Sequence, residues 1–172
     1  MKRIYVLLMH TNTYPSKFVK FMTKYSHVAL SLDKSCHTLY SFGRKKPNTI
    51  IDGGFSIENK DGEFFKKFSN AECKIYELDV QDEQYKNLKN NIEDMEENRD
   101  DYKYDFLGTA FRYLNIPVTF KNKYVCSYFV ASILEKNNIY NFNKETSLIK
   151  PQDFENLDGF TEIYAGKYLL YK

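Results

Sequence analysis

The sequence predicts an α+β protein that folds as a single domain over residues 1–172. Short apolar or alternating segments, typical of strands, occupy the first 80 residues and return after residue 160, whereas segments with helical spacing lie between residues 82 and 137. A chain of 172 residues is one domain by length, and no internal repeat or linker divides it. The aromatic content of 17% excludes a largely disordered chain.

The first expected element is a buried central strand over residues 4–9, a continuous apolar run that follows Lys2 and Arg3. This start resembles a signal peptide. The run ends at His10, however, and no small-residue cleavage site follows it. We therefore expect neither a signal peptide nor a membrane-spanning segment, and the expected location is the cytoplasm.

The next segments predict a short helix and a hairpin. Pro15 opens a helical pattern that runs to about residue 24. Residues 26–32 alternate between apolar and polar positions, and after a turn the chain returns over residues 38–42, which predicts two paired strands. Residues 43–62 are expected to form a loop because they carry several turn signals, including two adjacent glycines.

A further strand over residues 73–80 precedes three predicted helices. These cover residues 82–98, 106–114 and 126–137, and Asp105 is expected to cap the second of them. Two closing strands are expected around Gly166, at residues 161–165 and 167–171.

Composition and charge exclude several classes of function. The net charge of +2 gives no reason to expect a nucleic-acid partner. The three cysteines form neither a disulfide framework nor a Cys-x-x-Cys zinc site, and Cys36 and His37 are neighbours that would point to opposite faces of a strand. We therefore expect no metal, no cofactor and no stable membrane insertion. The sequence leaves the oligomeric state open.

Cys126 is the first candidate for chemistry because it stands where a loop becomes a helix. The free N–H groups and the positive end of the helix dipole favour a thiolate there, and the same N–H groups could stabilise an oxyanion. Cys126 also shares an apolar helical stripe with Phe129 and Val130, so a buried core thiol is the alternative interpretation.

His27 is the second candidate, at the start of the alternating strand. A lone histidine in such a place is more often a structural residue than a catalyst. Together with Cys126, however, it supplies the parts of a thiol hydrolase, in which an imidazole acts as base and then as acid for a cysteine nucleophile. The order along this chain is His then Cys, the reverse of the papain-like order.

These two segments resemble the circularly permuted papain-like (NlpC-type) cysteine amidases, in particular the YiiX-type group. That family carries a Ser-His-Val strand motif early and a Cys-Ser-x-Phe-Val helix motif late, and the resemblance extends over most of the chain. The matching segments here are Ser26-His27-Val28, Tyr40-Ser41-Phe42-Gly43-Arg44, Tyr102-Lys103-Tyr104-Asp105-Phe106-Leu107-Gly108, Cys126-Ser127-Tyr128-Phe129-Val130 and Lys150-Pro151-Gln152-Asp153-Phe154.

The resemblance implies a permuted papain-like fold in which a small antiparallel sheet packs against helices. It makes Cys126 the nucleophile, His27 the base and Ser41 the residue at the third catalytic position, where many relatives have an acid. A serine hydroxyl can orient the imidazole but cannot stabilise imidazolium by charge. The acid could instead come from elsewhere, and the candidates are Asp52, Glu58 and Asp153.

The leading hypothesis is therefore a cysteine peptidase or amidase that cleaves an amide bond in a small peptide, including peptides derived from the cell wall. An acyltransferase or thioesterase of the lecithin–retinol acyltransferase type is the alternative enzyme, because that group shares the permuted arrangement. A non-catalytic binding domain on the same fold is the third reading, favoured by the missing acid. A plain structural domain would leave the joint occurrence of the motifs as coincidence.

Overall fold

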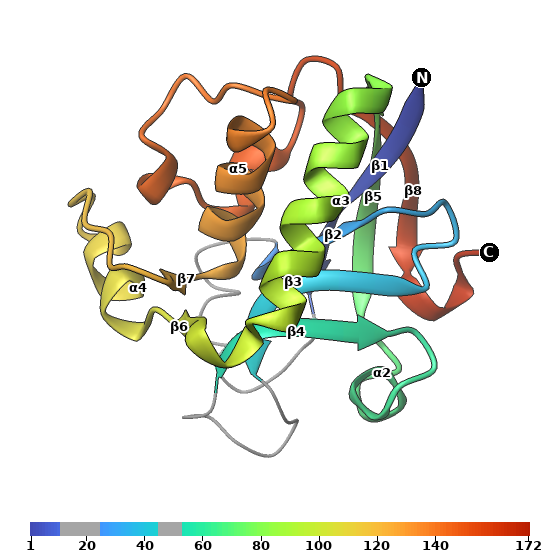
Figure 1. Ribbon diagram of the computed structural model, residues 1–172. Coiled ribbons are helices and arrows are strands. Elements are labelled where there is room, and N and C mark those ends of the chain that lie inside the picture. Colours follow the sequence, from blue (N-terminus) through green and yellow to red (C-terminus); the bar gives the residue numbers. More distant parts are fainter. Residues whose placement is uncertain (11–24, 45–52) are drawn as a thin grey trace.

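The computed structural model describes residues 1–10, 25–44 and 53–172, and it confirms an α+β protein (Figure 1). Eight strands form one curled sheet in the order β7-β6-β4-β3-β2-β1-β5-β8, and the described residues contain four α-helices. Paired strands are antiparallel except for β6 and β7, which are parallel.

The described elements have the following bounds. The strands are β1 (Lys2–His10), β2 (His27–Ser31), β3 (Thr38–Arg44), β4 (Gly53–Asn59), β5 (Glu72–Val80), β6 (Lys103–Tyr104), β7 (Lys123–Tyr124) and β8 (Thr161–Lys167). The helices are α2 (Glu63–Lys67), α3 (Asp82–Glu97), α4 (Phe106–Tyr113) and α5 (Cys126–Lys136). Short 3-10 turns occur at Arg99–Asp101, Thr146–Leu148, Pro151–Phe154 and Tyr168–Leu170.

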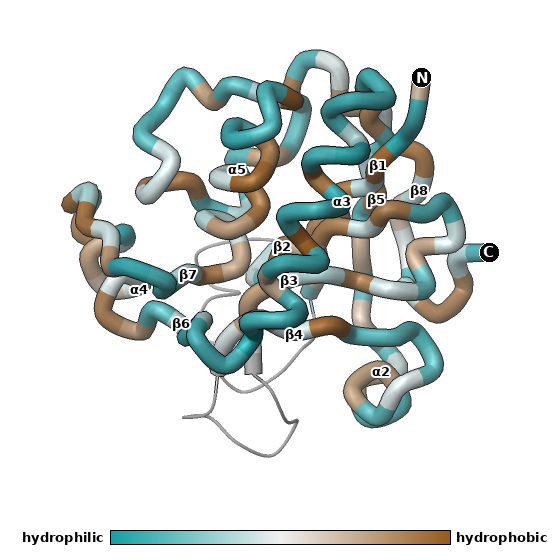
Figure 2. Tube along the Cα trace, viewed as in Figure 1, coloured by the Kyte–Doolittle hydropathy of each residue, from teal (hydrophilic) through white to brown (hydrophobic). Residues whose placement is uncertain are grey.

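The central strand β1 is buried on both faces, which explains its continuous apolar sequence. Ile4, Val6 and Leu8 belong to a core that is completed by α3 and α5 on one face of the sheet. Tyr5, Leu7 and Met9 alternate with them and belong to a second core, to which α2 and the C-terminal segment contribute. Figure 2 shows the hydrophobic positions of β1 and α5 in the interior, while α3 is mostly hydrophilic.

The predicted hairpin at residues 26–32 and 38–42 is confirmed as β2 and β3. The strands pair through Leu30 and Tyr40. Nearer to His27, the hydroxyl of Ser41 on β3 donates a 2.6 Å hydrogen bond to the carbonyl of Val28 on β2. A side chain therefore ties the two strands together at the end of the hairpin where the candidate histidine lies.

The three predicted helices are also confirmed. The carboxylate of Asp105 accepts a 2.8 Å hydrogen bond from the N–H of Gly108 and caps α4, as expected. Helix α5 packs against β2 and β3, and the ring of Phe129 lies 5.1 Å from that of Phe42. The predicted helix at residues 15–24 lies outside the described residues. Among those residues, no helix combines the length and apolar character needed to cross a bilayer.

The expectation of a loop throughout residues 43–62 is wrong, because β4 lies in this interval and pairs with β3 along its length. Gly53 does not mark a turn. A Cβ at Gly53 would lie 2.7 Å from the Cβ of Tyr104, so the missing side chain permits the close approach of the segment that forms β6.

The prediction of two closing strands is likewise wrong, because the structure has one strand, β8, followed by a 3-10 turn. Gly166 pairs with Cys73 inside the ladder instead of interrupting it. After β8, Tyr168 turns into the second core and its hydroxyl donates a 2.6 Å hydrogen bond to the carbonyl of Cys36. Burial of this tyrosine, rather than strand pairing, determines the path of the C-terminal segment.

Candidate active site

Cys126 is the first residue of α5, and its side chain is 7% exposed. Three backbone N–H groups interact with the sulfur, those of Val28, Ser127 and Cys126 itself. Two of them belong to the helix start, where N–H groups have no partner within the helix. The third comes from β2. The helix N-terminus and the sheet together thus surround the thiol with hydrogen-bond donors.

The local sequence fixes this position by holding the chain on both sides of Cys126. Before it, β7 pairs with β6, and the N–H of Asp105 donates to the carbonyl of Tyr124. After it, the hydroxyl of Ser127 donates a 2.6 Å hydrogen bond to the carbonyl of Ile149. The apolar side of α5, including Val130, then packs into the core. The nucleophile candidate is therefore positioned by rigid elements rather than by a loop.

Burial raises the pKa of the Cys126 thiol above its ordinary value, whereas the three N–H groups and the charge of Arg112 act in the opposite direction. The guanidinium of Arg112 is itself buried and donates from Nε to the carbonyl of Ser147 at 2.6 Å. Burial lowers the pKa of Arg112, but this strong base stays protonated. Cys126 is therefore a protonated thiol, and the N–H groups and Arg112 partly offset the cost that burial imposes on its anion.

His27 begins β2 and pairs with Met9 of β1. Burial lowers the pKa of the imidazole to about 4, so the ring is neutral at neutral pH and able to accept a proton. Its neighbour Val28 is the residue whose N–H reaches Cys126. The backbone at the start of β2 thus lies beside the thiol, and a direct contact between the imidazole of His27 and the sulfur stays a prediction.

Ser41 lies on β3 directly after Tyr40, the partner of Leu30, so the register places it beside Ala29 of β2. Its hydroxyl proton is directed to the carbonyl of Val28, as described above. The residue is fully buried. This contact gives Ser41 a structural task at the site, and its action on the imidazole stays a prediction.

Among the alternative acids, Glu58 is the one that the structure places near His27. A Cβ at Gly43 would lie 3.7 Å from His27 Cε1 and 3.8 Å from both Glu58 Oε1 and Ser56 Oγ. The imidazole of His27 and the carboxyl group of Glu58 therefore both border the small space that a side chain at Gly43 would occupy. Asp153 instead forms an ion pair with Lys144, and Asp52 lies outside the described residues.

The carboxyl group of Glu58 is unusual. Burial raises its pKa to about 7, although the Ser56 hydroxyl, 3.4 Å from Oε1, acts to lower it. The other oxygen, Oε2, is buried and has no hydrogen-bond partner among the described residues. A carboxyl group in this state could stabilise a protonated imidazole at His27 by charge, which Ser41 cannot do.

We expect Glu58 to make stability depend on pH. A folded-state pKa above the unfolded value of 4.5 means that the contribution of this group is most favourable at low pH and is lost as pH rises toward about 7. Glu58→Gln should therefore raise the free energy of unfolding relative to the wild type at pH 8, on the order of 1 kcal/mol, with a smaller effect at pH 5. Urea unfolding at the two pH values measures this difference.

The matched control is Glu97→Gln, which makes the same change at the exposed last residue of α3. That variant should show no such difference between the two pH values. An equal effect of Glu58→Gln at pH 5 and pH 8 would contradict the assignment of a raised pKa to Glu58.

The sequence analysis missed Arg112 and Tyr104, both of which interact electrostatically with Cys126. A signal for Arg112 was present. It is the one charged residue in the otherwise apolar pattern of α4, and a lone charge in such a helix needs a specific partner. Tyr104 carried no comparable signal, because the chain contains 15 tyrosines.

A comparison of the chain with protein-family models found no match, and searches of curated proteins and of solved structures also found none. The described residues contain no group of three or more His, Cys, Asp or Glu side chains that could hold a metal ion. The functional assignment therefore depends on the geometry of the site.

The three cysteines should differ in reactivity. Burial raises the pKa values of Cys36 and Cys73 to about 12, and neither lies at a helix N-terminus. Cys126 has three N–H donors and a nearby guanidinium, so we expect iodoacetamide to alkylate it at least about tenfold faster than the other two near neutral pH. Mass spectrometry of the peptides over time measures the rates. Equal rates would favour the core-thiol interpretation of Cys126.

Proposed function

We propose that the protein is a cysteine hydrolase that cleaves an amide bond in a small peptide, including peptides derived from the cell wall. Cys126 is the nucleophile and His27 the general base. One observation carries the proposal: the Cys126 thiol lies at the N-terminus of α5, among N–H groups that include that of Val28, the residue after His27. This arrangement unites a nucleophile with donors for an anion, and the proposal requires that the neutral imidazole of His27 reaches the same sulfur.

The two groups begin the reaction without charge. As the sulfur attacks the substrate carbonyl, His27 takes the thiol proton, and the backbone N–H groups stabilise the developing negative charge. The tetrahedral intermediate expels the amine, which receives the proton from His27, and an acyl thioester remains on Cys126. Water then attacks the thioester with His27 again as base, releasing the acid and restoring the thiol.

Nearby charges support the ion pair that forms during these steps. The guanidinium of Arg112 favours negative charge at Cys126. Glu58, once ionised, favours positive charge at His27. In our proposal Ser41 acts by holding Val28, and with it the N–H that faces the sulfur.

We also propose that the fold is a permuted papain-like fold. An α-helix that begins at the nucleophile and packs against an antiparallel sheet supports this assignment, as does the order of His27 on an early strand before Cys126 on a late helix. The Ser-His-Val and Cys-Ser-x-Phe-Val motifs lie at the starts of β2 and α5.

An acyltransferase or thioesterase is a second candidate, because apolar side chains of α4 are exposed on the helix that also carries Arg112 to the thiol. Such an enzyme would form the same acyl thioester on Cys126. A panel of peptide amides, esters and thioesters, followed by mass spectrometry of the peptide that contains Cys126, separates the candidates. An acyl adduct formed most readily from amides supports the amidase, whereas a preference for thioesters supports acyl transfer. No adduct from any substrate would favour the non-catalytic binding domain.

A further inference from the structure

Helix α4 presents its apolar side to solvent. Five of its residues or those just after it are large, hydrophobic and exposed, which is unusual for a set so close together in one segment. They define the α4 surface: Phe106 (50% exposed), Leu107 (62%), Tyr113 (45%), Leu114 (69%) and Ile116 (43%). The helix lies at the periphery of the molecule, where its apolar positions are visible in Figure 2.

The inner side of the same helix is polar, so α4 is inverted relative to an ordinary surface helix. Its buried residues are Gly108 and Arg112. Gly108 lies directly on the capping carboxylate of Asp105, and a Cβ there would clash with it at 1.8 Å. Arg112 is held by the carbonyl of Ser147. Polar contacts thus fix α4 to the protein and leave its apolar stripe free to bury itself elsewhere.

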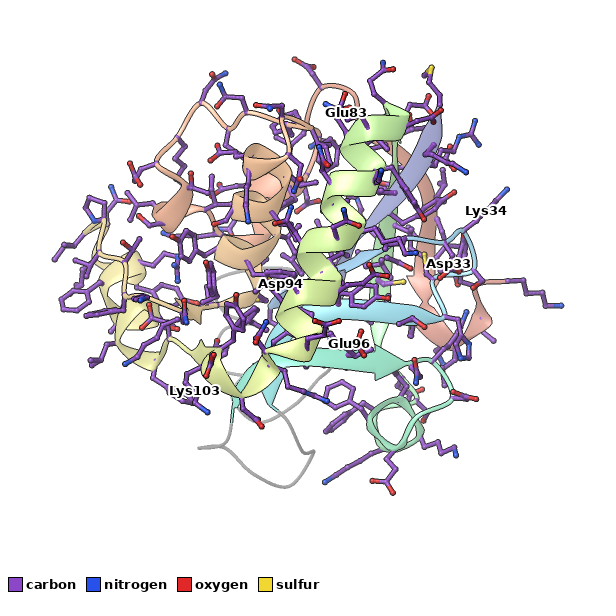
Figure 3. The ribbon with its side chains drawn as sticks, viewed as in Figure 1. Asp33, Lys34, Glu83, Asp94, Glu96 and Lys103 are labelled. Carbon is purple, nitrogen blue, oxygen red and sulfur yellow. The ribbon has the colours of Figure 1, made fainter. Side chains whose placement is uncertain are left out.

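Lysines accompany the α4 surface. Lys121 and Lys123 follow it in the sequence, and residues 106–134 contain no acidic residue. Lys150 is a third lysine, with Nζ 5.8 Å from the centre of the Tyr113 ring. Acidic side chains gather on another element, α3, where Figure 3 labels Glu83, Asp94 and Glu96.

We propose that the α4 surface binds the surface of an anionic lipid bilayer. Exposed aliphatic and aromatic side chains enter the boundary between headgroups and acyl chains, and lysines beside them are attracted by the negative lipid headgroups. A neutral peptide or protein partner would explain the apolar stripe but not the lysines that accompany it. This peripheral contact does not require a membrane-spanning segment.

Docking in this way would hold the thiol close to the lipid surface, because Arg112 and Tyr113 on α4 both interact electrostatically with Cys126. The lipid-binding proposal does not rest on the proposed hydrolase function, since it concerns the opposite side of the helix. The two can therefore fail separately.

Sedimentation with phospholipid vesicles tests the proposal. The wild-type chain should bind vesicles of phosphatidylcholine with phosphatidylglycerol, bind vesicles of phosphatidylcholine alone much more weakly, and be released by raised salt. The double variant Leu107→Glu/Leu114→Glu should lower the partition coefficient on anionic vesicles at least about tenfold. Lys121→Glu/Lys123→Glu should lower it on anionic vesicles and leave the weak binding to neutral ones unchanged.

Leu170→Glu is the matched control, because Leu170 is also an exposed leucine (68%) but lies in the C-terminal turn away from α4. It should bind vesicles like the wild type. Equal binding by the α4 double variant, or no binding of the wild type to anionic vesicles, would overturn the proposal. So would a dimer, detected by light scattering, that Leu107→Glu/Leu114→Glu converts to a monomer, because the surface would then be an interface between two copies of the chain.

Discussion

Cys126→Ala is expected to abolish amide cleavage, with a loss of at least about a thousandfold in kcat/KM, because it removes the thiol that would carry the acyl group. The substitution removes one atom from a buried side chain, so the cost in stability should be about 1 kcal/mol and the fold should persist. The rate of hydrolysis of the best substrate in the panel, measured beside the circular dichroism spectrum, checks both parts.

Cys73→Ala is the control for this variant. Cys73 is also a buried free thiol, 2% exposed, but it lies on β5 in the second core. It should lose a similar amount of stability and retain full activity. Activity that survives in Cys126→Ala, or that disappears equally in Cys73→Ala, would mean that the measured cleavage does not use Cys126 as its nucleophile.

His27→Ala is expected to lower kcat/KM by about 10²–10⁴-fold, the usual contribution of a general base, while leaving the thiol in place. Added imidazole should restore part of the rate, because the substitution leaves space where the ring stood. The wild-type rate should fall in two steps as pH is lowered: a partial fall near pH 7, where Glu58 becomes protonated and no longer supports the imidazolium, and loss of the base near pH 4, because burial lowers the pKa of His27 to about 4.

His37→Ala provides the matched comparison, because His37 is an exposed histidine that lies 3.4 Å from the carboxylate of Asp61. Its activity and its pH profile should equal those of the wild type. If His27→Ala keeps its activity, or if imidazole restores nothing and the rate of Glu58→Gln is lost completely near pH 6.5, His27 is not the base that the proposal requires.

Much of the fold follows from local features of the chain. The six apolar residues before His10 predict a strand buried on both faces, because only such a strand has no need of polar positions, and β1 is that strand. Asp105 predicts the start of α4, since its carboxylate satisfies an N–H that the helix cannot. The two candidate residues could also be chosen from the sequence, because each begins an element whose type is evident from periodicity.

The tertiary structure alone decided the features that depend on approach between distant segments. The two glycines of β4 are a local turn signal, which predicted a loop. Pairing of β4 with β3 and β6 makes the segment a strand instead. The inversion of α4 is similar: its pattern predicted a helix correctly but not which side faces solvent, because Arg112 is drawn inward by the carbonyl of Ser147, a residue distant in the sequence.

The site shows the same division. Local patterns predicted that Cys126 begins a helix and that His27 begins a strand, because capping and alternation act between residues a few positions apart. Only the tertiary structure brought the thiol to the N–H of Val28 and placed Glu58 beside the space at Gly43. Those neighbours meet through sheet register and through packing of α5 on β2, and burial at these contacts, which no local pattern encodes, is what shifts the pKa values of His27 and Glu58.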